Sequence, residues 1–198
     1  PIGNVVFSIT SSDATEVYLS TSTLTFNGSN WSTPQTVTVT GVDDSIDDGD
    51  VSSTVTVAVN KGNTADAKYD GLSVQTVSVA TIDDDIADFT VTASDGSMTV
   101  SESGSTKTFT VVLNSQPTGN VSFSLSPNDA GEVALSPSSL AFNTSNWETV
   151  QTVTVTGKDD SLIDGLVSSK IFVAINSHST KDSQYDILPS KILDVITL

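Results

Sequence analysis

Hydrophobic and polar residues alternate along most of the chain, which is typical of β-strands that bury one face. Alternate positions carry Val, Ile, Leu or Phe in the runs 5–9, 55–59 and 121–125. Turn-forming pairs such as Asn27-Gly28 and Asp48-Gly49 interrupt the runs at intervals of about ten residues. No stretch has the spacing of an amphipathic helix. The pattern predicts an all-β protein built from antiparallel, immunoglobulin-like β-sandwiches.

The second half of the chain repeats the first. Residues 3–82 align with residues 119–198 without a gap, at a constant offset of 116 (119 − 3), and 44 of the 80 aligned residues are identical. The heptapeptide Gln-Thr-Val-Thr-Val-Thr-Gly occurs at both 35–41 and 151–157. This offset is too long for solenoid or propeller repeats, and it fits a whole β-sandwich domain of about 100 residues. The chain is therefore predicted to hold two tandem copies of one domain.

The two copies differ in extent. Residues 89–118, which include an alternating apolar run at 109–113, have no counterpart before residue 1. We therefore predict two domains, 1–87 and 88–198, of which the first lacks its opening strands. The missing strands predict an open sheet edge in the first domain, which is either capped by a neighbouring molecule or left frayed.

Charge and composition exclude several classes of function. The 198 residues include 24 Asp and Glu against 7 Lys and Arg, a net charge of −17, and the pI is near 4.1. Binding to nucleic acid depends on Lys and Arg, so no nucleic-acid partner is expected. Cys is absent and His178 is the one histidine, which excludes thiolate chemistry and zinc sites with several His ligands. No apolar run reaches the ~18 residues that cross a bilayer, so no membrane insertion is expected.

Acidic residues are clustered at the ends of predicted strands. Asp43-Asp44 follows the strand at 35–41, and Asp83-Asp84-Asp85 follows the last strand of the first copy. Loops of a sandwich gather at its two ends, where such clusters can meet. Carboxylates held together repel one another, and Ca²⁺, which accepts six to eight oxygen ligands, removes that repulsion more readily than Mg²⁺ with its strict octahedral geometry. The alternative interpretation is a solvated acidic surface that serves solubility.

These elements resemble the Calx-beta domain, a calcium-binding sandwich of sodium–calcium exchangers, integrin β4 and many bacterial surface proteins. The resemblance covers nearly the whole chain. It is carried by the stretch from Leu24 to Asp44, by Glu102 before Gly104, and by the triple Asp at 83–85. The first of these stretches, with its Leu-Thr-Phe, Asn-Trp and Val-Asp-Asp elements, is similar to tandem modules of large bacterial adhesins.

The resemblance also implies a set of calcium ligands. The matching residues are Glu16, Asp43, Asp44, Asp48, Asp83, Asp84 and Asp85 in the first copy, and Glu102, Glu132, Asp159, Asp160 and Asp164 in the second. Asp48 and Asp164 occupy positions where the family often has Glu, which has a longer reach. The first copy has no equivalent of Glu102, and the second has no equivalent of the triple Asp, so the first site is expected to bind calcium more tightly.

Other residues that recur between the copies have structural interpretations. Six acids are predicted to cap turns: Asp13, Asp66, Asp70, Asp129, Asp182 and Asp186. The aromatic residues at Trp31, Tyr69, Trp147 and Tyr185 are predicted to plug the sandwiches, because buried aromatics dominate core area. A sugar-stacking platform at the two Trp side chains is the alternative.

With the resemblance, these features predict a calcium-binding structural spacer of a secreted or surface-anchored bacterial adhesin-like protein, with Ca²⁺ stiffening the junction between domains. Its expected location is extracellular or on the cell surface, and its expected partners are neighbouring repeat modules of the same polypeptide. The alternative function is an adhesion module that binds a glycan or a partner on a cell surface. Enzyme activity is not expected, because the acidic clusters suggest no unique cleft and His178 lies in a predicted loop.

Overall fold

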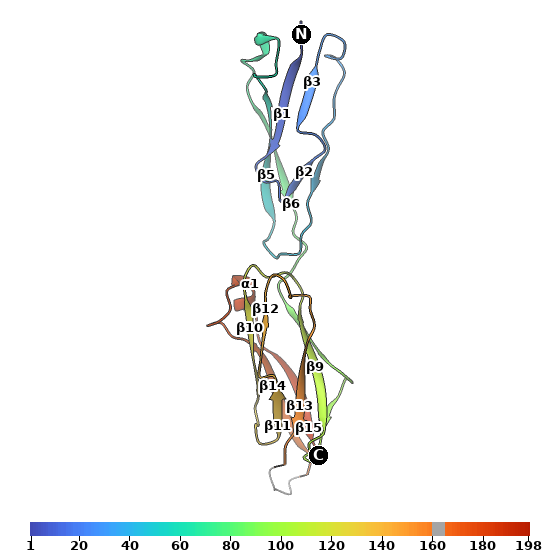
Figure 1. Ribbon diagram of the computed structural model, residues 1–198, viewed down its shortest axis with the longest axis vertical. Coiled ribbons are helices and arrows are strands. Elements are labelled where there is room, and N and C mark those ends of the chain that lie inside the picture. The colour runs from blue at the N-terminus through green and yellow to red at the C-terminus, as the bar shows by residue number, and fades with distance from the viewer. Residues whose placement is uncertain (160–164) are drawn as a thin grey trace. The chain divides into compact units, whose positions relative to one another are not determined.

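The computed structural model of the protein describes residues 1–159 and 165–198 (Figure 1). Nearly all of its regular structure is β-strand arranged in largely antiparallel sheets, which confirms the predicted fold class. The chain divides into two compact units: unit 1 is Pro1–Asp44 with Asp48–Asp84, and unit 2 is Ser45–Asp47 with Asp85–Leu198. Among the described residues, no helix has the length and apolar character needed to span a membrane.

Unit 1 is an incomplete sandwich. A four-stranded sheet in the order β3-β1-β5-β6 packs against a two-stranded sheet formed by β2 and β4. The elements are β1 (Val5–Ser11), β2 (Val17–Leu19), β3 (Thr23–Phe26), β4 (Val39–Gly41), β5 (Val51–Val59), the 3-10 helix η1 (Ala67–Tyr69) and β6 (Gln75–Thr81). The core is small: Ile9, Val17 and Val55 are its buried members.

Unit 2 is a complete sandwich. A five-stranded sheet in the order β12-β10-β14-β15-β8 packs against a four-stranded sheet in the order β11-β13-β9-β7. The elements are β7 (Phe89–Ala93), β8 (Met98–Val100), β9 (Thr106–Leu113), β10 (Val121–Pro127), β11 (Val133–Ser136), β12 (Ser139–Phe142), β13 (Gln151–Gly157), β14 (Val167–Ile175), α1 (Ser183–Asp186) and β15 (Lys191–Thr197). Its core draws fully buried side chains from both sheets, such as Phe109 and Val153 from one and Phe123 and Ile171 from the other.

Three strands of unit 2, β7, β8 and β9, have no counterpart in unit 1. The duplicated heptapeptide shows the consequence. All seven of its residues form β13 in unit 2, where β9 pairs with them along one edge, but in unit 1 the last three alone form β4. Val155 is completely buried, whereas its counterpart Val39 is 38% exposed. Strand length is therefore set here by the partner strand, because the local sequence is the same.

The prediction that the aromatic residues plug the sandwich is correct in unit 2 and wrong for Trp31. Trp147 packs against the core, and Tyr185 is buried with its hydroxyl donating to the carbonyl of Ser115 at 2.7 Å. In unit 1, Trp31 is 63% exposed and Tyr69 is half-buried. The strands that enclose these positions in unit 2 are the ones that unit 1 lacks.

Four of the six predicted turn caps are confirmed. The side chains of Asp13, Asp66, Asp129 and Asp182 each accept a hydrogen bond from the backbone N–H two residues further on, at 2.9, 3.3, 2.9 and 2.9 Å respectively. This is the Asx turn, which short carboxylates form readily. These acids are therefore used locally to shape loops.

Candidate metal centre

Glu16 lies where the two-stranded sheet of unit 1 ends. It directly precedes β2, and its carbonyl oxygen accepts a hydrogen bond from the N–H of Val42 at 2.9 Å, which extends the β2–β4 ladder by one step. The Thr81 hydroxyl at the end of β6 donates to the same carbonyl at 3.2 Å. Glu16 is thereby fixed beside the loop that follows β4.

The loop at 42–50 carries the other acids and is tied to the segment after β6. The Asp83 carboxylate accepts hydrogen bonds from the N–H groups of Asp48 and Gly49, at 3.0 and 2.6 Å. In return, the Asp83 N–H donates to the carboxylate of Asp50 at 3.1 Å. Gly49 has φ of +79°, a left-handed conformation that glycine adopts without strain. These contacts set the position of Asp48.

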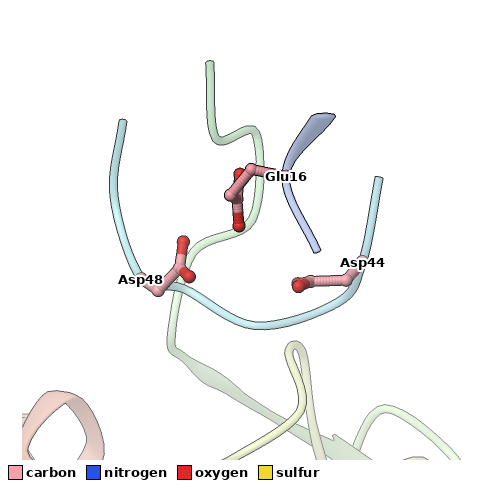
Figure 2. A group of neighbouring side chains, drawn as sticks. All are labelled: Glu16, Asp44 and Asp48. Carbon is pink, nitrogen blue, oxygen red and sulfur yellow. The ribbon is translucent and has the colours of Figure 1, made fainter. Parts of the chain in front are cut away.

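Glu16, Asp44 and Asp48 converge on one space (Figure 2). Each offers a carboxylate oxygen, and these three oxygens all lie within 4.8 Å of one another. The Asp44 and Asp48 side chains are exposed, whereas Glu16 is 9% exposed. None of the described residues donates a hydrogen bond to the Glu16 carboxylate or forms an ion pair with it. Three carboxylate oxygens at this spacing are compatible with a shared metal ion.

The charges of this cluster oppose its ionisation. Burial raises the pKa of Glu16 above its usual 4.5, and the negative charges of Asp48, Asp13, Asp44 and Asp83 raise it further. The pKa of Asp48 is raised in the same way, first by desolvation and then by Asp44 and Asp83. Unit 1 contains ten acids and two lysines, Lys61 and Lys68, so it has few cations to offset this repulsion.

The raised pKa of Glu16 predicts a pH effect on stability in the presence of chelator. A carboxyl group whose pKa is higher in the folded than in the unfolded protein stabilises the folded state at pH values below its pKa in the unfolded protein. This stabilisation is lost as the pH rises through the pKa of the group in the folded protein. Glu16→Gln, which removes the charge, should therefore stabilise unit 1 more at about pH 7 than at about pH 4. Thermal melts of both proteins across this range measure the difference. Glu148→Gln, at an exposed loop position of unit 2, is the matched control and should show no such trend. A Glu16→Gln difference that is constant with pH would contradict the assignment.

The ligands that the Calx-beta resemblance implies for the first copy therefore fall into separate groups. Asp43 and Asp84 form a second pair, with exposed side chains and carboxylate oxygens within 4.8 Å of each other. Asp83 holds the loop through backbone N–H groups and lies close enough to raise the pKa values of Glu16 and Asp48. Asp85 is the first residue of the second segment of unit 2.

In unit 2 the counterpart site is described in part. Asp160 and Asp164 lie outside the described residues. Glu132 is 3% exposed, and its carbonyl oxygen accepts the Lys158 N–H at 2.8 Å, which matches the contact between Glu16 and Val42. Within the described part of unit 2, the structure does not gather Glu102, Glu132 and Asp159 into a cluster of three.

Two acids that the sequence analysis left without a role organise this region. Asp50 accepts the N–H of Asp83, and Asp47, in unit 2, accepts the N–H of Ala87 at 2.7 Å. Lys158 also differs from its counterpart Val42, and its amine donates to the carbonyl of Ala130. The lysine is visible in the alignment of the two copies. The hydrogen bonds of Asp47 and Asp50 depend on loop geometry that the spacing of acids does not determine.

Comparisons with known proteins find similar structures but no matching family. No protein family matches the sequence, and no curated protein matches it. Domains 4 and 5 of the S-layer protein SbsC are 12% identical over 96% of this chain and 68% of that one, with a TM-score of 0.37. The calcium binding domain CBD12 of CALX1.1 is 16% identical over 86% of this chain and 66% of that one, with a TM-score of 0.39. SSP-19, an MSP-domain protein like family member of Caenorhabditis elegans, is 16% identical over 54% of this chain and 95% of that one, with a TM-score of 0.36. These TM-scores are too low for the similarities to carry an argument about function.

Proposed function

We propose that unit 1 binds Ca²⁺ through Glu16, Asp44 and Asp48, in a loop that Asp83 holds in place. The observation that supports this is the Glu16 carboxylate. It is nine-tenths buried, its charged neighbours are acids, and no described residue donates a hydrogen bond to it. Burying an ionised carboxylate without a partner is costly. A bound cation supplies the partner and lowers the pKa values of Glu16 and Asp48, which burial and neighbouring acids raise.

The ligand chemistry favours calcium over other metals. The three side chains present oxygen alone, and carbonyl oxygens and water complete the six to eight ligands that Ca²⁺ accepts. Zn²⁺ in proteins is held mostly by Cys and His, of which the chain has none and one. Mg²⁺ demands a stricter octahedron and retains its water. We expect an affinity of about 10⁻⁴–10⁻³ M, as in extracellular calcium modules.

The role of the ion in this proposal is structural. It joins the residue before β2 to the loop that runs from β4, in the same two-stranded sheet, to β5 in the four-stranded sheet. We extend the proposal to the remaining residues implied by the Calx-beta resemblance: Asp43, Asp84 and Asp85, and in the second copy Glu102, Glu132, Asp159, Asp160 and Asp164. The second copy is expected to bind more weakly because its ligand set is smaller.

We further propose that the chain is a calcium-stabilised spacer of an adhesin-like bacterial surface protein, located outside the cell. Tandem duplication of a sandwich supports a role in building an extended chain of modules. The resemblance of Leu24–Asp44 to adhesin repeats supports the same setting. Its partners in this proposal are neighbouring modules of the same polypeptide.

Titration calorimetry of the 198-residue chain with Ca²⁺ tests the proposal. Glu16→Gln and Asp48→Asn should each weaken binding at least about tenfold, which corresponds to about 1.4 kcal/mol. Glu148→Gln is the matched control and should bind as the parent does. Mg²⁺ should produce little heat under the same conditions.

Near-ultraviolet circular dichroism establishes that each variant is folded before titration. Asp84→Asn distinguishes between the two acidic groups as the binding site. It removes a carboxylate from the exposed pair, Asp43 and Asp84, and leaves the cluster around Glu16 intact. Calcium binding that is unchanged in both Glu16→Gln and Asp48→Asn would overturn the assignment of the site.

A further inference from the structure

The chain contains one Asn-Gly pair, Asn27-Gly28, in the turn that follows β3. In the second copy the corresponding turn follows β12 and begins with Asn143-Thr144. The sequences Asn-Gly-Ser-Asn-Trp at 27–31 and Asn-Thr-Ser-Asn-Trp at 143–147 differ at this one position. An asparagine side chain reacts most readily with its own backbone when glycine follows, because glycine has no side chain to restrict the approach of its nitrogen. The duplication therefore holds a reactive pair and a much less reactive one.

The two turns share their main hydrogen bonds. The Oδ1 atom of Asn27 accepts the N–H of Ser29 at 2.8 Å, and that of Asn143 accepts the N–H of Ser145 at 2.8 Å. The backbone carbonyl of each Asn also accepts the N–H three residues further on, at 3.3 Å in both copies. The reactivity of the two pairs can therefore be compared in turns of closely similar conformation.

The exposure of this turn does not depend on where the chain begins. In unit 2, where the sandwich is complete, Asn143 and Thr144 are both exposed. In unit 1, Gly28 is exposed and Asn27 is half-buried. No described residue accepts a hydrogen bond from the backbone N–H of Gly28 or of Thr144. The nitrogen that follows each Asn is therefore available for reaction.

The side chain of Asn27 is held with its carbonyl group polarised. Its Oδ1 atom accepts the N–H of Ser29 at 2.8 Å and that of Asn30 at 3.3 Å. Attack on Cγ turns Oδ1 into an oxyanion, and backbone N–H groups that already point at this oxygen stabilise the developing charge. None of the described residues accepts a hydrogen bond from Nδ2 of Asn27, so no such contact retains this nitrogen as it leaves.

We propose that Asn27 is a site of spontaneous deamidation. In the first step the Gly28 nitrogen gives its proton to water and attacks Cγ of Asn27. The new N–Cγ bond closes a cyclic imide, the Cγ–Nδ2 bond breaks, and Nδ2 takes up a proton and leaves as ammonia. In the second step water opens the imide, at Cγ to give Asp or at the backbone carbonyl to give isoaspartate. Water is the only co-reactant, and no oxidation or reduction takes place.

The two products affect the turn differently. An Asp at position 27 keeps the oxygen that accepts the N–H groups of Ser29 and Asn30. Isoaspartate routes the main chain through the side chain, which lengthens the backbone by a carbon atom and takes the Asn27 carbonyl out of the main chain. That carbonyl accepts the N–H of Trp31 at 3.0 Å, so the turn loses a bond that holds it closed. Unit 1 is therefore expected to change with time in a way that unit 2 does not.

Incubation of the full 198-residue chain in mildly alkaline buffer tests the proposal. After denaturation, chymotrypsin, which cuts after Phe and Trp, releases residues 27–31 and 143–147 as two matched pentapeptides. Mass spectrometry with fragmentation follows the change of the first Asn to an acid, and labelling by an isoaspartate methyltransferase detects the isoaspartate. We expect Asn27 to convert at least about tenfold faster than Asn143. The rate should increase with pH, because the attacking nitrogen reacts as its anion.

The matched variants exchange the residue that differs between the turns. Gly28→Thr should slow the conversion of Asn27 at least about tenfold, and Thr144→Gly should accelerate that of Asn143 by a similar factor. Gly28 is not among the glycines with positive φ, and a Cβ atom there would lie 3.7 Å from the nearest atom, the carbonyl oxygen of Pro1, so threonine fits. Near-ultraviolet circular dichroism establishes that both variants are folded.

Four results would each overturn the proposal. The first is an equal rate at Asn27 and Asn143 in the parent chain. The second is conversion of Asn27 in urea but not in the folded chain, which would mean that the turn protects it. The others are a Gly28→Thr chain that converts Asn27 as fast as the parent, and a Thr144→Gly chain that converts Asn143 no faster. None of these measurements involves calcium, so their outcome is independent of the proposed metal site.

Discussion

Raising calcium from chelator to about 100 times its dissociation constant should stabilise unit 1 by about 2.7 kcal/mol, because a ligand that binds the folded state alone shifts the unfolding equilibrium by mass action. For a unit of 81 residues (44 + 37) this corresponds to an increase in melting temperature of roughly 10–20 °C. The gain comes from the cluster of Glu16, Asp44 and Asp48, whose repulsion the ion removes.

This calcium effect is measured by following the emission of Trp31 in a Trp147→Phe background, so that the signal reports on unit 1. Magnesium at the same concentration should give a much smaller increase. Glu16→Gln should remove at least about half of the calcium effect, as a tenfold loss of affinity implies, while melting no lower than the parent in chelator, since it deletes a buried charge. Equal stabilisation by both ions, or an undiminished effect in Glu16→Gln, would argue against a calcium site at this cluster.

Truncation of an aromatic ring should affect the two units very differently. Phe123→Ala removes a completely enclosed ring that contacts both Phe89 and Phe142, and we expect it to destabilise unit 2 by about 3–5 kcal/mol. Phe7→Ala, at the corresponding position, removes a half-buried ring beside an open cavity. Phe7→Ala should lower the free energy of unfolding of unit 1 by less than about half as much, because less apolar surface is re-exposed.

Urea unfolding measures both losses in the same chain. Trp147 emission in a Trp31→Phe background reports on unit 2, and Trp31 emission in a Trp147→Phe background reports on unit 1. The two substitutions are a matched comparison, since Phe7 and Phe123 are the same residue type at corresponding positions of the two copies. Equal losses at the two positions would mean that the core of unit 1 is closed in solution.

The sequence was sufficient to predict the fold because its pattern is redundant. Alternation recurs in both copies, and the gapless alignment of 3–82 with 119–198 predicts that the same strands form twice. Residues 89–118 have no earlier counterpart in the sequence, which is the basis for predicting a first copy without its opening strands. The extent of β4 was not predictable, because residues 35–41 are identical to 151–157 and the difference arises from pairing with β9.

The sequence predicted which acids belong to the candidate site better than it predicted which of them lie together. Glu16, Asp44 and Asp48 were all among the predicted ligands, and their carboxylate oxygens lie within 4.8 Å of one another. The separation of Asp43 from Asp44 into different groups was not predictable, because the directions of neighbouring side chains in a loop depend on a backbone conformation that the spacing of acids does not determine. The exposure of Trp31 was missed for a similar reason: a Trp that follows Asn looks the same in both copies, and its burial depends on strands far away in the sequence.

The parallel pairing of β15 with β8 has a mechanical consequence for unit 2. Val195, Ile196 and Thr197 lie in register with Met98, Thr99 and Val100, and the two strands run in the same direction. Tension that draws the start of β8 away from the end of β15 acts along both strands, so it strains their hydrogen bonds together instead of opening them one after another. Since resistance to forced unfolding depends on the rate of unfolding, such an arrangement should let a complete sandwich withstand a pulling load. In unit 1, where β6 has no such neighbour among the described strands, the same load meets no parallel pair.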